Sequence, residues 1–444
     1  MNPVIVEAPA SKSMSHRALI AAALSRGETT LTRVLDSDDL QRTSTCLEAV
    51  GARISGTSTV NVVGTQAGPV GGKDEPASLY MHESGTSCRL LTGVMGAGKG
   101  KFRVHGAPRM HERPIGALTD ALESQGVDIH FESAKGFPPF VMDVTKLSGG
   151  DVSIPLEESS QYLSGLLLAA PFAETTTIIN VAGRKVVSWP YVALTLQVMR
   201  DFGINFSVQT MIDGEWKDAD FAHPETTAPG TIRFIVEPSP YRTPETYAVE
   251  GDWSNASYFL AAGALGPCGV TVKGLKADSL QGDKAIAEIL EKMGAQITFA
   301  DDAVTAAPPA TGKLKGITVD MGACPDLVPT VVAVAAFAEG DTTITNVAHL
   351  RIKECDRLAA PAAELAKVGG GATIGDDNIT IHPAPVKAGA KVEFKAYGDH
   401  RMAMSTALYS LRGINGTVDD PECVGKSFPE FWKKFAPVLK ANGV

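Results

Sequence analysis

Positively charged side chains stand at the starts of predicted helices in this 444-residue chain. In "SKSMSHRALIAAAL", Lys12 and Arg17 open a segment whose alanine-rich body must be buried. The first backbone N–H groups of a helix lack internal partners and carry partial positive charge, so they attract phosphate and carboxylate groups. This stretch predicts either an anion site or ordinary capping by Ser11 or Ser13, and it favours neither on its own.

The same arrangement recurs along the chain, which favours the anion site. The other cations at or beside predicted helix starts are Arg89, Arg109, Arg113, Lys353, Arg357, Arg401 and Lys426. Arginine binds phosphate and carboxylate through a planar fork, whereas lysine acts as a point charge. The whole chain is acidic, with a formal net charge of −10. These cations therefore predict a local site for a multiply anionic ligand.

Acidic residues among these cations offer proton transfer. In "CPDLVPTVVAVAAF", Asp326 starts a strongly apolar helix, so it is either a general base for a hydroxyl or a helix cap, and spacing alone favours the cap. Glu354 and Asp356 lie between Lys353 and Arg357, as proton carriers or as salt-bridge partners that orient the cations.

Uncharged polar side chains begin two further predicted helices. They are Ser159, Ser160 and Gln161 in "EESSQYL", and Ser188 and Tyr191 in "VVSWPY". Together they are able to hold a phosphate and sugar-like hydroxyls, although each single serine is more simply a helix cap.

Composition excludes several classes of function. No long basic run is present, which argues against a nucleic-acid or membrane-surface role. The six cysteines and nine histidines are scattered, so we expect no metal site. No phosphate-binding glycine loop of the ATP or dinucleotide type occurs. The start "MNPVIVEAPASKS" is not a secretory leader, and no apolar run approaches about 20 residues, so we expect a soluble cytoplasmic protein.

The predicted elements repeat six times. Each copy has a polar start, an alanine-rich helix, a β-branched strand and a second helix that ends on glycine. The glycines are Gly51, Gly126, Gly203, Gly294, Gly369 and Gly443, separated by 75, 77, 91, 75 and 74 residues. Glycine supplies the left-handed conformation that ends a helix.

Six copies in a chain of this length predict two domains of three copies. The largest spacing contains a polar, proline-rich passage, which places the crossing between domains near residues 238–244. We expect an N-terminal domain at 10–240, and a second domain made of 1–9 plus 241–444.

Ten motifs, in order and nearly end to end, give the chain a resemblance to the EPSP synthase family. They are "SKSMSHRAL", "SGTSCRLL", "PRMHERPIGAL", "SSQYLSGLL", "VSWPYVALTL", "VEGDWSNASYFLAA", "PDLVPT", "LRIKECDRL", "DHRMAM" and "GKSFPEFW". The resemblance implies an α/β (α+β) fold, the inside-out α/β barrel of enolpyruvyl transferases. It has six βαβαββ repeats, three per domain, and an active site in the interdomain cleft.

The resemblance also implies the reaction. The enolpyruvyl group of phosphoenolpyruvate is transferred to the 5-hydroxyl of shikimate 3-phosphate through a tetrahedral intermediate, and phosphate is released. This step belongs to the shikimate pathway, which leads to chorismate and the aromatic amino acids. The resemblance implies two small-molecule partners and no cofactor, and we expect a monomer. Glyphosate inhibits the family at the phosphoenolpyruvate site.

Matching motifs assign residues to each substrate. Shikimate 3-phosphate is expected at Lys12, Ser13, Arg17, Ser159, Ser160, Gln161, Ser188, Asp326, His349 and Lys353. Phosphoenolpyruvate is expected at Lys12, Gly85, Arg113, Gln161, Arg357, Arg401 and Lys426. The resemblance implies that Asp326 accepts the 5-hydroxyl proton, and that C3 is protonated by Lys12 or by Glu354; the sequence does not decide between these two.

One departure from the family falls in the expected phosphoenolpyruvate pocket. Glu83 replaces a usual asparagine, and a carboxylate repels an anionic ligand unless it is protonated, turned away or paired, for example with Arg89 or Arg113. Gly85 argues for glyphosate binding and Glu83 argues against it. The other departures are His16, Leu90 and His349.

Two alternatives remain. The related transferase that acts on UDP-N-acetylglucosamine lacks "SKSxSxR" and carries a loop cysteine, which the loop "APRMHERP" does not contain. A catalytically inactive, anion-binding relative is favoured only by Glu83.

Overall fold

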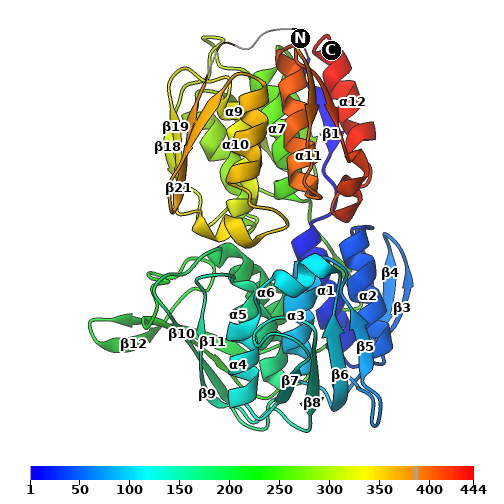
Figure 1. Cartoon of the computed structure of the whole chain (residues 1–444). Helices are drawn as coiled ribbons and strands as arrows, with labels where there is room; N and C mark the ends of the chain where they lie inside the picture. The colour runs from blue at the N-terminus through cyan, green and yellow to red at the C-terminus, as the bar shows by residue number, and fades with distance from the viewer. Residues whose placement is uncertain (1, 384, 386–388) are drawn as a thin grey trace. The chain divides into compact units, whose positions relative to one another are not determined.

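The computed structural model describes residues 2–383, 385 and 389–444, which form two compact units. Unit 1 comprises Met1–Ser11 together with Glu250–Val444, and unit 2 comprises Lys12–Val249. Both ends of the chain lie on unit 1 (Figure 1), where β1 (Val4–Glu7) packs against α12 (Phe431–Ala441). Unit 2 is thus a continuous segment inserted into unit 1.

The chain returns to unit 1 after Val249, later than the crossing near 238–244 and the boundary at 240 expected from the proline-rich passage. The segment after residue 240 belongs to unit 2, because β14 (Thr246–Ala248) pairs with a strand of that unit. Tyr241 is buried there, and its hydroxyl donates a hydrogen bond of 3.0 Å to the carbonyl oxygen of Leu168.

Unit 2 contains three sheets, with strand orders β14-β2-β4-β3, β5-β6-β8-β7 and β12-β11-β13-β10-β9. Besides β14, their strands are β2 (Glu28–Thr32), β3 (Arg53–Gly56), β4 (Val60–Val63), β5 (Ala77–Tyr80), β6 (Gly100–His105), β7 (Asp128–Phe131), β8 (Phe140–Val144), β9 (Gly150–Pro155), β10 (Thr177–Ala182), β11 (Phe206–Ile212), β12 (Glu215–Asp218) and β13 (Ile232–Val236). The α-helices are α1 (Lys12–Leu24), α2 (Asp38–Ala49), α3 (Gly85–Met95), α4 (Gly116–Ser124), α5 (Gln161–Ala169) and α6 (Trp189–Asp201), with 3-10 turns η1 (Pro108–Glu112) and η2 (Ala170–Phe172).

The described residues of unit 1 also form three sheets, with strand orders β1-β15-β17-β16, β18-β19-β21-β20 and β22-β23. Besides β1, their strands are β15 (Val270–Lys273), β16 (Gln296–Ala300), β17 (Ala303–Ala307), β18 (Thr318–Asp320), β19 (Thr342–Thr345), β20 (Gly371–Ile374), β21 (Asn378–His382), β22 (Lys391–Phe394) and β23 (Asn415–Val418). Besides α12, the α-helices are α7 (Trp253–Leu265), α8 (Ala285–Lys292), α9 (Val328–Ala335), α10 (Ala359–Lys367) and α11 (His400–Thr406). The 3-10 turns are η3 (Gly282–Lys284), η4 (Pro325–Leu327), η5 (Ala348–Ile352), η6 (Ala407–Arg412) and η7 (Pro421–Lys426).

One strand pattern underlies the repeats. The first two strands are parallel, and a β-hairpin then adds its second strand beside them in antiparallel orientation, as β5, β6, β8 and β7 show. In the first sheet of each unit, the first strand comes from the chain crossing: β1 pairs with β15, and β14 pairs with β2. The sixth copy differs from the predicted βαβαββ unit, because its sheet contains only β22 and β23 among the described residues.

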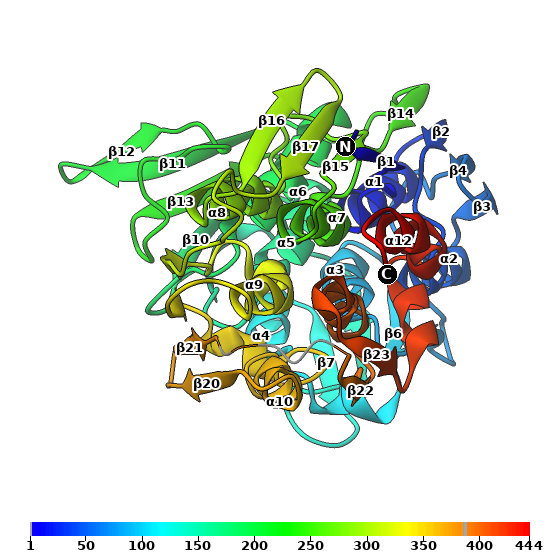
Figure 2. The ribbon, with the colours of Figure 1, turned by 90° about the horizontal axis from the view of Figure 1, so that it is seen from above.

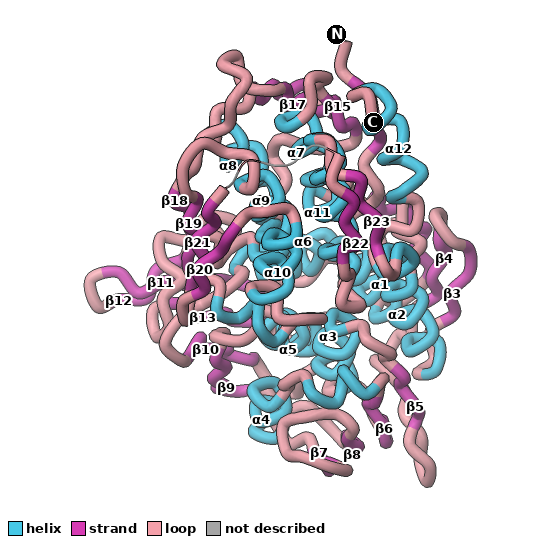
Figure 3. Tube along the Cα trace, turned by 45° about the horizontal axis from the view of Figure 1, so that its top comes forward, coloured by secondary structure: helices cyan, strands magenta, loops and turns pink. Residues whose placement is uncertain are grey.

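The predicted inside-out arrangement is confirmed, with helices inside and separate sheets outside rather than one closed barrel. Every residue of α7 is buried. Figure 2 shows β15 and β17, β20 and β21, and β22 and β23 on three sides of α7 and α9. In Figure 3, strands β18, β19 and β21 run along the outside of α9 and α10. The predicted glycine ends are also confirmed, because Gly51, Gly126, Gly203, Gly294, Gly369 and Gly443 all have positive φ.

Two glycines allow the inner helices α3 and α5 of unit 2 to touch through their backbones. A methyl group built on Gly93 would lie 2.2 Å from the carbonyl carbon of Gly165. No side chain adjusts to relieve such a contact, because both partners are backbone. Close contact of α3 and α5 therefore depends on glycine at residue 93.

Substituting Gly93→Ala should force α3 and α5 apart and lower the free energy of unfolding by about 1–3 kcal/mol, as for other overpacked cores. Urea unfolding followed by circular dichroism measures this change. Gly116→Ala is the matched control, since its methyl would meet its nearest neighbour at 3.4 Å, an ordinary contact. Equal stability of the two variants would contradict the prediction.

Candidate active site

The start of α1 in unit 2 carries the first two expected ligand residues. Lys12 forms an ion pair with Asp39 of α2, and their side chains are 14% and 5% exposed. Ser13 follows, and its carbonyl oxygen accepts a hydrogen bond of 2.9 Å from Nη1 of Arg17, one helical turn later. The lysine charge is therefore held at the helix start by an aspartate that sequence reasoning did not identify.

Arg17 is a completely buried cation that has no carboxylate partner in the described part of the chain. Its Nε donates to the hydroxyl of Thr195 at 2.8 Å, and its Nη2 donates to the carbonyl oxygen of Tyr191 at 2.9 Å and to Ser164 Oγ at 3.5 Å. Every hydrogen-bond acceptor it has among the described residues is a hydroxyl or a carbonyl, so its positive charge is not compensated within unit 2. Burial lowers the pKa of Arg17 to about 10, which leaves it charged at neutral pH.

The starts of α3 and α5 meet through the side chain of Gln161. Its Nε2 donates to Thr86 Oγ1 at 3.0 Å, and its Oε1 accepts from Nη1 of Arg89 at 3.4 Å. Its backbone N–H donates to Ser159 Oγ at 3.2 Å. Ser160, the residue before α5, is buried and makes no side-chain cap. The expected polar residues Ser159, Ser160 and Gln161 thus lie together where the starts of α3 and α5 adjoin.

Arg113 lies against the start of α3. Its side chain is nearly buried, and Nη1 donates to the backbone carbonyl oxygen of Glu83 at 3.3 Å. A methyl group on Gly85 would lie 2.6–2.7 Å from the guanidinium of Arg113. Glycine at residue 85 therefore leaves the space that this guanidinium occupies. The hydrogen bond also links the backbone of the unusual Glu83 to an expected ligand residue.

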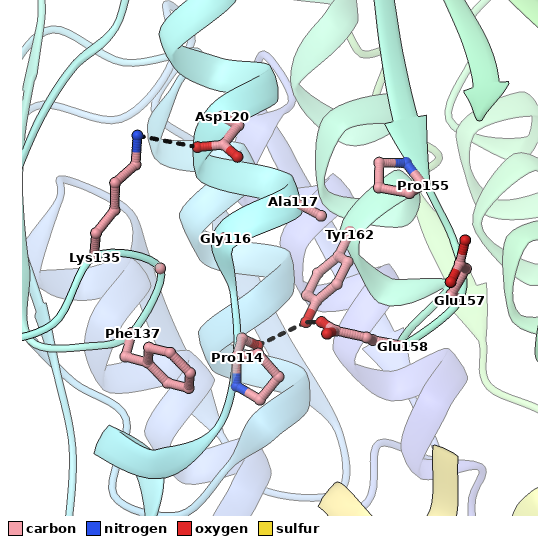
Figure 4. A pocket seen from close by; sticks show the side chains of 11 residues that line it. Pro114, Gly116, Ala117, Asp120, Lys135, Phe137, Pro155, Glu157, Glu158 and Tyr162 are labelled. Atoms are coloured by element: carbon pink, nitrogen blue, oxygen red, sulfur yellow. Dashed lines mark hydrogen bonds and ion pairs between the residues drawn. The ribbon is translucent and has the colours of Figure 1, made fainter. Parts of the chain in front are cut away.

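A pocket whose lining includes Pro114, Glu158 and Tyr162 shows how the segment that follows Arg113 is anchored (Figure 4). The hydroxyl of Tyr162 donates to the carbonyl oxygen of Pro114 at 2.7 Å and contacts Oε2 of Glu158 at 3.2 Å. Nη2 of Arg89 donates to the same carbonyl at 3.4 Å, and its guanidinium lies 5.6 Å from the centre of the Tyr162 ring. Arg89 therefore helps to fix the backbone of Pro114, the residue that follows Arg113.

Two further buried residues of unit 2 differ from the others, Ser188 in its backbone conformation and His16 in its pKa. Ser188, directly before α6, is buried with φ 57° and ψ 39°, a left-handed conformation that is uncommon for serine. His16 is buried, and burial followed by the charge of Lys12 lowers its pKa to about 3, so the ring is neutral. Its Nδ1 lies 2.8 Å from Thr43 Oγ1, which contacts Ser87 of α3. His16 therefore joins the first three helices.

In unit 1 the expected residues gather around Asp326, in η4. Its Oδ1 accepts a hydrogen bond of 2.8 Å from Nη1 of Arg357, and its Oδ2 accepts one of 2.8 Å from Nη2 of Arg401. Burial disfavours the charged carboxylate. The charges of Arg401, Arg357 and Lys353 outweigh burial and hold the pKa of Asp326 well below its ordinary value. Asp326 is therefore an anion bound to two guanidinium groups.

Arg357 is the centre of this cluster. Its Nε and Nη2 donate to both carboxylate oxygens of Asp399, at 2.7 and 3.0 Å, and Nη2 also donates to Glu354 at 2.9 Å. Lys426 lies 3.4 Å from the other oxygen of Glu354. The three carboxylates raise the pKa of Arg357 despite its burial. Arg357, Arg401 and Lys426 are thus each paired with a carboxylate, whereas Arg17 has none among the described residues.

His349 and Lys353 lie four residues apart in the same segment of unit 1. His349 is buried in η5, and Lys353 follows the end of that turn. Lys353 contributes to the low pKa of Asp326 through its charge. Both expected residues therefore belong to the segment that also carries Glu354 and Arg357.

Sequence reasoning missed three residues that orient the expected ones. Asp39 pairs with Lys12, Thr195 accepts from Arg17, and Asp399 holds Arg357 and accepts from the backbone N–H of Arg401 at 2.9 Å. Only Asp399 had a sequence signal, since it precedes a helix in "GDHRM" as a capping residue does. The other two act across long distances in sequence.

The described residues contain no group of three or more histidines, cysteines, aspartates or glutamates that could hold a metal ion. Within the same described part of the chain, no helix is long and apolar enough to cross a membrane.

Comparison with known proteins gives consistent similarities. A family model described as EPSP synthase (3-phosphoshikimate 1-carboxyvinyltransferase) matches residues 4–435. The 3-phosphoshikimate 1-carboxyvinyltransferase of Shewanella baltica (strain OS155 / ATCC BAA-1091) is 40% identical over 433 residues, covering 97% of this chain and 96% of the relative. That of Shewanella denitrificans (strain OS217 / ATCC BAA-1090 / DSM 15013) is 41% identical over 434 residues, covering 97% and 95%.

Solved structures are similar over almost the whole chain. EPSP synthase from Acinetobacter baumannii aligns with a TM-score of 0.75 and 27% identity, covering 99% of this chain and 96% of that one. The enolpyruvyl transferase NikO from Streptomyces tendae aligns with a TM-score of 0.72 over 99% and 94% of the two chains. At 17% identity, NikO supports the fold alone.

Substituting Asp399→Asn should lower the free energy of unfolding by about 3–5 kcal/mol, because it removes one partner of a buried ion pair. Asp399 is completely buried and meets Arg357 through two hydrogen bonds. Urea unfolding measures the change. Asp341→Asn is the control, since Asp341 is 57% exposed and pairs with His382. A loss as small as that of the control would contradict the prediction.

Proposed function

The chain belongs to the EPSP synthase (3-phosphoshikimate 1-carboxyvinyltransferase) family, and we propose how its own residues carry out the family's reaction. It transfers the enolpyruvyl group of phosphoenolpyruvate to the 5-hydroxyl of shikimate 3-phosphate and releases phosphate. The observation that carries this proposal is the buried guanidinium of Arg17, whose charge no carboxylate compensates among the described residues. A buried charge of this kind favours an anionic ligand.

Shikimate 3-phosphate is the anionic ligand of this region of unit 2. Its phosphate and carboxylate bind the helix starts at Ser13, Ser159 and Ser160, and the buried guanidinium of Arg17 supplies positive charge. The remaining contacts come from Lys12, Gln161, Ser188, Asp326, His349 and Lys353. Helix starts suit this role, because their backbone N–H groups and partial positive charge favour phosphate.

Phosphoenolpyruvate binds a second set of cations. Arg113 and Lys12 provide charge from unit 2, and Gln161 offers its amide. Arg357, Arg401 and Lys426 provide charge from unit 1. Gly85 leaves room for the guanidinium of Arg113. A planar guanidinium binds a carboxylate or a phosphate through two hydrogen bonds, which fixes the orientation of the bound molecule.

The reaction needs two proton transfers. Asp326 accepts the proton of the 5-hydroxyl as that oxygen forms a bond to C2 of phosphoenolpyruvate. C3 gains a proton from Lys12 or from Glu354, which gives a tetrahedral intermediate. Loss of a proton from C3 and cleavage of the bond between C2 and the phosphate oxygen then yield the enolpyruvyl ether and inorganic phosphate.

We further propose a cytoplasmic monomer with these two small molecules as its substrates. The lack of a long basic run supports small molecules as its partners, because proteins that bind nucleic acids or membrane surfaces concentrate such charge. The role of Glu83 toward glyphosate is part of the same proposal: its carboxylate weakens binding of the inhibitor, since both are anionic.

The reaction is tested by measuring phosphate release from the purified protein with both substrates, and with each omitted in turn. Release that requires both substrates is expected. Binding of shikimate 3-phosphate without release would indicate the inactive, anion-binding alternative. Release with UDP-N-acetylglucosamine in place of shikimate 3-phosphate would indicate the other transferase. Titration of glyphosate into the complete mixture, for the natural chain and for Glu83→Asn, measures the effect of Glu83, and equal inhibition would contradict that part.

Substituting Gly85→Ala should displace the guanidinium of Arg113 and raise the KM for phosphoenolpyruvate. Loss of a hydrogen bond from a charged group costs about 1.5–3 kcal/mol, which corresponds to about tenfold to hundredfold. The KM for shikimate 3-phosphate should change by less than about threefold. Gly371→Ala is the matched control, because its methyl would meet only an ordinary contact at 3.8 Å. An equal rise in both KM values would contradict the role of Gly85.

A further inference from the structure

The carboxylate of Asp326 accepts hydrogen bonds from two buried guanidinium groups in unit 1. Arg357 and Arg401 each donate one hydrogen bond of 2.8 Å, to different oxygens of the same carboxylate. The arginine side chains are 2% and 9% exposed, whereas that of Asp326 is 20% exposed. Asp326 therefore lies on the solvent side of the pair and covers it.

Asp326 is the most exposed of the three carboxylates bound to Arg357. Asp399 is completely buried, and Glu354 is 12% exposed and also lies 3.4 Å from Lys426. Asp399 additionally accepts from the backbone of Arg401 at the start of α11. Of the three carboxylates, Asp326 is therefore the one most accessible to an anion from solvent. Asp399 and Glu354 have further bonds to the protein, which keep them in place.

We propose that the carboxylate of Asp326 occupies the carboxylate site of phosphoenolpyruvate in the unliganded protein, and that binding of this substrate displaces it. The inference rests on the proposed function for the identity of the ligand. One carboxylate replaces another, so both guanidinium groups keep an anionic partner throughout. The exchange avoids the large free-energy loss that follows when a buried charge loses its partner.

The exchange couples substrate binding to base strength. While two arginines donate to Asp326, its carboxylate is stabilised and accepts a proton poorly. Once phosphoenolpyruvate holds both arginines, Asp326 loses these stabilising bonds and its basicity rises. Two acids near it, Glu354 and the buried Asp283, favour the protonated form further. The base is thus released at the moment when its co-substrate is in place.

The first test is the affinity of Asp326→Asn for phosphoenolpyruvate alone and for inorganic phosphate, measured by isothermal titration calorimetry. A neutral amide competes poorly for two guanidinium groups, so both probes should bind about tenfold more tightly than to the natural chain, because the competing state is lost. Phosphate release should fall at the same time, since the base is absent. The substitution preserves the shape of a partly exposed side chain, and thermal unfolding checks that the variant folds.

The matched control is Asp301→Asn, which removes the same charge from an exposed turn between β16 and β17. Its affinity for both probes should equal that of the natural chain. Unchanged or weaker binding by Asp326→Asn would overturn the exchange. This outcome is distinct from failure of the proposed function, which phosphate release by the natural chain reports separately.

A crystal structure of the natural chain with phosphoenolpyruvate separates exchange from a general charge effect. The expected result is a ligand carboxylate bonded to Arg357 and Arg401, with Asp326 beyond hydrogen-bonding distance of both. A structure in which Asp326 keeps its two 2.8 Å bonds while the ligand lies elsewhere would overturn the proposal.

Discussion

Complete burial of the inner helices is the constraint on which the rest of each unit depends. A helix such as α7, with no exposed residue, gains from packing on every side but leaves its first backbone N–H groups without internal partners. Small residues bring these helices together, as at Gly93 and Gly165. Capping side chains then satisfy the helix starts, as Asp252 does by accepting from the backbone N–H of Asn255 at 2.7 Å. Helix starts that caps do not satisfy are favourable positions for anions.

The two units treat positive charge differently. In unit 2, Arg17 donates only to hydroxyl and carbonyl oxygens among the described residues, so in the proposed function an anionic substrate balances its charge. In unit 1, Arg357 is already bonded to three carboxylates. In the proposed function, unit 2 therefore binds an anion directly, whereas in the proposed exchange unit 1 first releases the carboxylate of Asp326 from its arginines. This asymmetry suits a reaction with one tightly held acceptor and one donor that activates the base.

Sequence reasoning recovered the features that are local. The six glycine positions and the polar helix starts follow from patterns within about ten residues, and the structure contains them. The crossing at Val249 was missed, because β14 is short and belongs to unit 2 only through its pairing with β2. The partners of Lys12 and Arg17 were missed for a related reason. Asp39 and Thr195 carry no local signal and come together only through packing of separate helices.

The pairing of β1 with β15 has a consequence for synthesis of the chain. Val4 lies opposite Val270, with the whole of unit 2 between them in sequence. During translation, β1 leaves the ribosome early and waits without its partner strand until β15 follows. Unit 2 is complete by Val249 and contains its own sheets, including the pairing of β14 with β2. Domains generally fold as units as they emerge. Unit 2 is therefore expected to fold before β1 pairs with β15, although β1 precedes unit 2 in the sequence. Strand β1 is therefore made before unit 2 but is paired only after it.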